Sequence, residues 1–174
     1  VEKGFREVMK RNQVTILDTM HADGWKAELA AEYVYTHGDR VRLADGIMCG
    51  NDDLATQVVH ALAETRRAGD ILVVGQDADL AACQRIVEGT QIMTVYKPVE
   101  KLATRAAQEA VALAKGEELS GEDVTEIENG TYAVPYIGLE PISVTKDNID
   151  EVIIGSGFHL KEDVYLNVPD EMPE

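Results

Sequence analysis

Short apolar runs alternate with helical stripes along most of this chain, and that alternation constrains the fold more than any other feature. Three runs, "ADGIMCGND", "ILVVGQD" and "QIMTVYK", each hold consecutive apolar residues and end in polar ones. A stripe of Leu54, Val58 and Leu62 and the segment "DLAACQRIVEG" separate them with helical spacing. Continuously apolar strands in strict turn with helices indicate a parallel sheet covered by helices on both faces. The sequence therefore predicts the α/β class.

The same pattern is expected ahead of these runs, and it changes after them. We expect a helical turn or two over residues 4–12, a strand over 14–21 ("VTILDTMH") and a helix over 25–38. From Pro98 one longer helix is predicted to run to Gly116, with an apolar face that includes Val99, Leu102 and Leu113. An acidic polar loop (118–131), an extended stretch (132–145), a short helix (146–153) and a tail are expected to follow.

Polar or aromatic side chains are expected just beyond the ends of the predicted strands. Trp25 follows the first strand, Asn51 the second, Asp77 the third and Lys97 the fourth. Ligands of open parallel sheets bind outside the carboxyl ends of the strands, so these four residues are the candidate site. A carboxamide, a carboxylate and an ammonium group can both donate to and accept from hydroxyl groups, and an indole can cover the apolar face of a sugar ring. The combination suits an uncharged polyol.

Each candidate also has a structural interpretation. Trp25 could be a packed aromatic at a helix start, and Asn51, like Asp52, could be a simple helix cap. Asp77 could be present because strand-to-helix junctions favour Asp, and Lys97 could be a solvated lysine. The pattern alone leaves both interpretations open.

Asp77 and Asp79 lie one residue apart in "VVGQDADLAA", and we expect different roles for them. Asp77, at the strand end, is the expected ligand acceptor. Asp79 lies where an N-cap or first-turn acid would stabilise the helix that begins at Leu80. The pair could alternatively serve as acid and base in an enzyme. We expect the two carboxylates to diverge, so no catalytic residues are assigned.

Composition excludes several classes of function. The net charge of −16 repels phosphate backbones and anionic membranes, which excludes nucleic acid as an expected partner. The four histidines lack metal-ligand spacing, and motifs for dinucleotides, nucleoside triphosphates and serine hydrolases do not occur, so we expect no metal and no cofactor. Cys49 and Cys83 lie in apolar stretches, where free thiols behave as small hydrophobes.

One long run of the chain resembles a known family. "GNDDLATQVVHALAETRRAGDILVVGQDADLAACQRIVEGTQIMTVYKPVEKLA", Gly50 to Ala103, is similar to the xylose-binding members of the type I periplasmic sugar-binding proteins. "GQDADLA" and "GTQ-x-MTVYKP" carry the resemblance, with "DGW" upstream and "VTKDNIDEVII-x-x-GFH" downstream in the same order. "CGND" departs from the more familiar "SND" and leaves Asn51 in place.

The resemblance implies a fold, a site and a location. It implies that Trp25 stacks on a pyranose while Asn51, Asp77 and Lys97 bond its hydroxyls between two α/β lobes. Residues 1–97 and 133–174 would form the C-terminal-type sugar-binding lobe, and residues 98–132 would belong to the other lobe. The first lobe and any signal peptide would be absent from this sequence. The protein would act outside the cytoplasm.

The expected function is therefore non-catalytic binding of D-xylose or a similar aldose as the substrate-binding component of an ABC importer. The implied partners are the sugar, the transporter permease, and either the missing N-terminal lobe or a second copy of the chain. A sugar-sensing domain of a receptor or of a transcriptional repressor is the alternative, although no DNA-binding segment is recognisable in the sequence.

Overall fold

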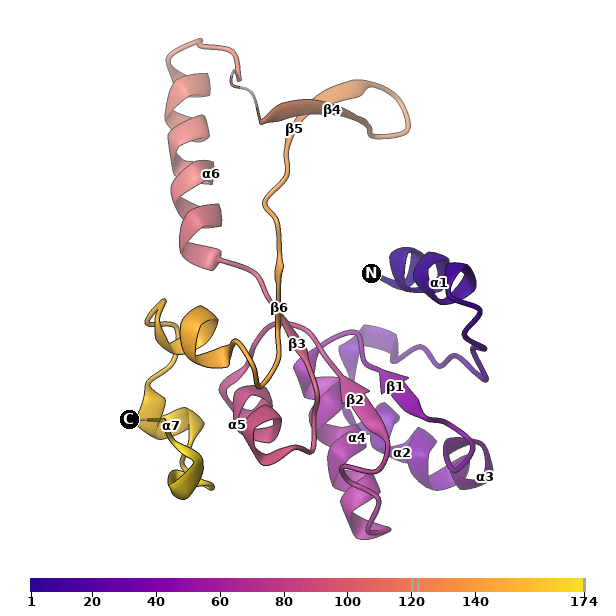
Figure 1. Cartoon of the computed structure of the whole chain (residues 1–174). Helices are drawn as coiled ribbons and strands as arrows, with labels where there is room; N and C mark the ends of the chain where they lie inside the picture. Colours follow the sequence, from indigo (N-terminus) through magenta and orange to yellow (C-terminus); the bar gives the residue numbers. More distant parts are fainter. Residues whose placement is uncertain (120, 122, 174) are drawn as a thin grey trace. The chain divides into compact units, whose positions relative to one another are not determined.

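The computed structural model describes residues 1–119, 121 and 123–173, and it divides into two compact units. The first unit comprises residues 1–96 and 143–174, and the second comprises residues 97–142. Figure 1 follows the chain through both units from the N-terminus to the C-terminus. The prediction that residues 98–132 belong to another lobe stays a prediction.

Parallel strands with helices between them build the first unit. Its elements before residue 97 are α1 (Glu2–Arg11), α2 (Glu28–Thr36), α3 (Gly38–Val41), β1 (Gly46–Met48), α4 (Asp52–Glu64), β2 (Leu72–Val74), α5 (Leu80–Glu88) and β3 (Thr94–Tyr96). The chain returns through β6 (Ile142–Val144), a π-helical turn (Asp150–Ile154) and α7 (Lys161–Val164). This order confirms the predicted α/β class.

The sheet is short and parallel where its register is defined. β1 and β2 pair in parallel, with Ile47 opposite Val73. A parallel bridge between Val74 and Met93 continues toward β3, and β3 pairs with β6. Beyond that bridge the Asp77 amide donates to the Val95 carbonyl at 2.9 Å, so the loop after β2 stays attached to β3.

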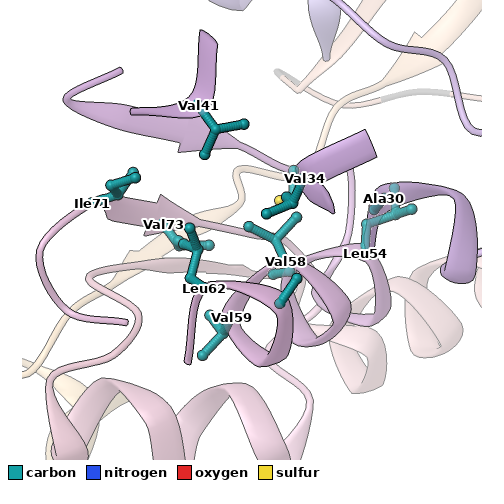
Figure 2. Packing of buried hydrophobic residues seen from close by; sticks show 12 residues of the cluster. Ala30, Val34, Val41, Leu54, Val58, Val59, Leu62, Ile71 and Val73 are labelled. Carbon is teal, nitrogen blue, oxygen red and sulfur yellow. The ribbon is translucent and has the colours of Figure 1, made fainter. Parts of the chain in front are cut away.

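The core of this unit lies where α4 packs on β2 and α2. The predicted stripe of α4 is buried, and Leu62 and Val73 are each 1 % exposed. Figure 2 shows Ala30 and Val34 of α2 beside Leu54 and Val58 of α4. Burying an aliphatic side chain of this size stabilises the fold by about 1.5–3 kcal/mol, so this contact fixes α4 and the loop that begins it.

The strand expected over residues 14–21 does not form. Residues 14–22 have no regular structure, and no backbone ladder with this run occurs among the described residues. Side chains hold the run instead, because Asp18 accepts hydrogen bonds from Tyr33 at 2.7 Å and from Arg40 at 2.6 Å. A strand needs a neighbour for its backbone groups, and apolar content does not supply one.

The second unit holds α6 (Val99–Ala114) and a hairpin, whose first strand forms where a polar loop was expected and whose second strand lies in the predicted extended stretch over residues 132–145. β4 (Val124–Glu128) pairs antiparallel with β5 (Ala133–Ile137), while Ser120 and Glu122 of the expected loop lie outside the described residues. Asn129 closes the turn, since its Oδ1 accepts from the amides of Thr131 and Tyr132 at 3.0 and 2.9 Å. Gly130 adopts φ 96°, which glycine tolerates best.

The predicted helix of this unit is confirmed, with no buried residue on α6. None of the helices that the structure describes has the length and apolar character needed to cross a membrane.

Candidate functional site

The carboxyl ends of β1 and β2 lie at one edge of the parallel sheet, and Asn51 and Asp77 follow them. Asn51 is the N-cap of α4, and its Oδ1 accepts from the Leu54 amide at 3.0 Å. The capping interpretation is therefore confirmed for Asn51. Its Nδ2 has no hydrogen-bond partner within the described part of the chain. One side chain can thus cap the helix through oxygen and donate to a ligand through nitrogen.

Trp25 lies at this edge too. It ends a single 3₁₀ turn (Asp23–Trp25) with φ 59°, and its side chain is 64 % exposed. A Cβ placed on Gly50 would lie 3.1 Å from the indole Cζ3, so the ring lies against the residue just before Asn51. The packed-aromatic interpretation is wrong, because most of the indole is in solvent. An exposed aromatic plane can cover the apolar face of a ligand.

The loop that carries Asp77 has an unusual backbone. Asp77 and Ala78 both adopt left-handed torsions, with φ 109° and 57°. Such residues each cost roughly 1–3 kcal/mol and persist only where surrounding structure holds them. Here the Ala78 amide donates to Thr94 Oγ1 at 3.1 Å, and the Ala78 carbonyl accepts from His159 Nε2 at 2.8 Å. Strain of this kind gathers at ligand sites.

Asp79 is at the predicted N-cap position of α5, but the expected cap bond is absent. Its side chain makes no capping hydrogen bond, with φ −58° and ψ 149° at this residue. Desolvation raises the pKa of its carboxyl, and the nearby charges of Asp52, Asp53 and Asp77 raise it further. The N-cap position is therefore confirmed, the capping bond expected of it is wrong, and repulsion from the neighbouring acids disfavours the charged carboxylate.

Beneath this edge lies a buried polar network that the sequence reasoning missed. Asp52 is 0 % exposed, and its carboxylate accepts from Thr94 Oγ1 at 2.7 Å and from Gln91 Nε2 at 2.9 Å. Burial raises the pKa of this carboxyl, while those hydrogen bonds act in the opposite direction. Arg85 donates to Gln91 Oε1 at 3.0 Å and is itself buried. The sequence offered only a possible cap at Asp52.

An aromatic cluster from the end of the chain was also missed. Phe158 packs on Tyr96 with ring centroids 4.8 Å apart, and His159 packs on Phe158 at 4.5 Å. Because a carbonyl oxygen can only accept, His159 Nε2 carries the proton in its bond to Ala78. The one available signal was "GFH", which the family resemblance contained without assigning it a role.

The fourth candidate, Lys97, directly follows Tyr96, the last residue of β3, and it is the first residue of the second unit. Its participation in the site stays a prediction. Cys49 and Cys83 are both buried free thiols, as expected. Among the described residues no group of His, Cys, Asp and Glu side chains could hold a metal ion.

Comparison with known proteins gives one consistent result. The periplasmic binding protein domain family matches residues 1–118. The D-xylose-binding periplasmic protein of Haemophilus influenzae is 38 % identical over 172 residues, which cover 91 % of this chain and 51 % of that protein. The protein of the same name from Escherichia coli is 34 % identical over 166 residues, or 93 % and 49 % of the two chains.

A solved structure agrees with these sequence matches. The carbohydrate transporter solute-binding protein from Chloroflexus aurantiacus, in complex with D-glucose, is 30 % identical, with a TM-score of 0.64 over 79 % of this chain and 40 % of that one. The chain spans about half the length of the curated relatives it matches. Because the family match covers more than half of its residues, the chain belongs to the periplasmic binding protein domain family.

Proposed function

We propose that this chain binds a monosaccharide, D-xylose or a close aldose, without catalysing a reaction on it. The proposal rests on one observation above all. The exposed indole of Trp25 lies against Gly50, beside the available amide of Asn51, at the carboxyl edge of the sheet. The names of the matched relatives, which are D-xylose-binding proteins, support the same ligand class.

The chemistry of each group suits one part of a sugar. The indole of Trp25 would cover the C–H face of the ring, and Asn51 Nδ2 would donate to a hydroxyl oxygen. The carboxylate of Asp77 would accept from one or two hydroxyls, and the ammonium group of Lys97 would donate to another. These groups bind and orient a polyol, and the matched relatives are named as binding proteins. We therefore assign the chain no catalytic step.

The proposed role is the substrate-binding component of an ABC importer outside the cytoplasm. The matched structure is named a carbohydrate transporter solute-binding protein, and the matched relatives are named periplasmic. A permease is the implied partner. Since the chain spans about half of those relatives, we propose that a second half, or a second copy of this chain, completes the sugar site.

Fluorescence of Trp25, the only tryptophan, tests the proposal directly. Stacking a sugar on a mostly exposed indole removes water from it, so D-xylose at millimolar concentration should shift and change the emission. Thermal stability should rise with the same sugar. If D-xylose, D-glucose, L-arabinose and D-ribose all leave both signals unchanged, the proposal is wrong.

A matched pair of charge variants tests the assignment of Asp77. Asp77→Asn should weaken binding by about 10- to 150-fold, because a charged acceptor contributes about 1.5–3 kcal/mol to a buried hydrogen bond. Asp70→Asn removes the same charge from an exposed turn before β2 and should leave affinity unchanged. Equal affinities in the two variants would contradict the assignment.

A further inference from the structure

We propose that Asp52, which touches no sugar, is the positioning residue of the site; this inference rests on the proposed sugar binding. Its buried carboxylate uses both oxygens as acceptors. Oδ2 accepts from Thr94 Oγ1 at 2.7 Å and from the Asp79 amide at 3.1 Å, and Oδ1 accepts from Gln91 Nε2 at 2.9 Å. One carboxylate therefore joins the start of α4, the loop after β2 and the segment leading into β3.

The bonds of Asp52 reach Asp77 from both sides. The Asp52 amide donates to the Gln76 carbonyl at 2.8 Å. On the other side, Thr94 Oγ1 donates to Asp52 and accepts from the Ala78 amide at 3.1 Å. Both chain neighbours of Asp77 are thus fixed to one residue, which is also the chain neighbour of Asn51. Asp52 thus sets the relative position of Asn51 and Asp77, the two residues proposed to bind the sugar.

The local packing leaves no substitute for the carboxylate. A Cβ on Gly75 would lie 2.1 Å from Asp52 Oδ1, so the carboxylate occupies the space that a side chain there would fill. Both oxygens face donors, and an amide at this position would turn an NH₂ group toward one of them. The shape would be kept, but one acceptor would be lost. The left-handed torsions of Asp77 and Ala78 would then lose part of the hydrogen-bond network that stabilises them.

Sugar titrations of three variants of the whole chain test this inference. Asp52→Asn should weaken D-xylose binding by about tenfold or more, since Asp77 and Asn51 lose their fixed spacing. Asp53→Asn removes the same charge from the neighbouring exposed residue and should bind as the parent does. Ile153→Val lowers stability from a buried site and should also leave affinity unchanged. If Asp52→Asn binds within twofold of the parent, the inference is overturned.

Amide hydrogen exchange supplies a readout that needs no sugar. In Asp52→Asn the amides of Ala78 and Asp79 should exchange at least several-fold faster, while those over residues 58–62 of α4 keep their protection. Uniform acceleration along the chain would mean a merely structural role and would overturn the inference. If the parent binds no sugar while this local effect appears, the proposed function fails and the coupling of Asp52 to the loop stands. Thr94→Val, which removes one partner of Asp52, gives the same exchange test should Asp52→Asn not fold.

Discussion

Replacing Gly75 by alanine should be among the most destabilising single changes in the chain. The added Cβ would lie 2.1 Å from Asp52 Oδ1 and 3.0 Å from Gln91 Nε2. The added Cβ and Asp52 Oδ1 must separate by about 1 Å to reach ordinary contact, because non-bonded carbon and oxygen atoms do not approach so closely. The carboxylate is buried and bonded on both oxygens, so it has no space to move without breaking a bond.

The magnitude follows from two contributions. Breaking the bond between Gln91 and the charged Asp52 carboxylate costs about 1.5–3 kcal/mol. Forcing an extra methyl group into packed surroundings costs about 1–3 kcal/mol more. The sum is about 2.5–6 kcal/mol, which lowers the Tm of a chain of this length by roughly 5–24 °C.

Thermal and urea unfolding measure the effect, with Gly38→Ala as the matched control. Gly38 lies in α3, and apart from its chain neighbours and its own helix backbone no atom of the described residues lies within 4 Å of the position that an added methyl group would take, so alanine there should stabilise by about 0.5–1 kcal/mol. The double variant Gly75→Ala with Asp52→Ala removes the clashing oxygen, and its loss should be clearly smaller than the sum of the single losses. A Gly75→Ala loss under about 1 kcal/mol, or strict additivity in the double variant, would refute the reasoning.

Two further predictions concern charge and thiol chemistry. Asp79→Asn should raise the Tm at pH 7, because desolvation and neighbouring acids raise the folded-state pKa of Asp79. When the carboxyl pKa is higher in the folded than in the unfolded chain, the stability of the folded chain falls as the pH rises from the unfolded-state pKa toward the folded-state pKa. The Tm gain of Asp79→Asn should therefore vanish below about pH 3.9, where the group is protonated in both states. A Tm gain that persists at that pH would contradict this cause. Burial raises the pKa of the Cys49 and Cys83 thiols to about 12, so a disulfide reagent at pH 8 should react with both only after unfolding. Rapid reaction of the folded chain would count against that burial.

Sequence reasoning succeeded where the signal is local. The apolar run before Asp77 and the stripe of α4 that begins after Asn51 are properties of neighbouring residues, so the strand ends could be predicted. Asn51 and Asp77 followed from these strand ends. Trp25 was chosen from the strand expected over residues 14–21, which does not form, yet the structure places its ring against Gly50, the residue before Asn51. The β4–β5 hairpin also had a local signal, since Asn129 and Gly130 are typical turn residues, but the acidic composition around them favoured a loop.

The rest depends on contacts that no local pattern contains. Asp52 looks like a helix cap in sequence, and its partners Gln91 and Thr94 lie 39 and 42 residues further along the chain. The run over residues 14–21 has strand composition but lacks a pairing neighbour among the described residues. Trp25 is exposed and ends a 3₁₀ turn ahead of α2, and a helical pattern does not predict that turn.

The bond between His159 and Ala78 has a consequence for synthesis of the protein. It joins residues 81 positions apart, and it holds the loop that presents Asp77. On the ribosome His159 is added 81 residues after Ala78, so the loop is made well before the side chain that donates to it. Contacts of such long sequence separation form late. A nascent chain halted before residue 159 should therefore leave the loop of Asp77 and Ala78 without this hydrogen bond, so the conformation of that loop depends on a residue made long after it.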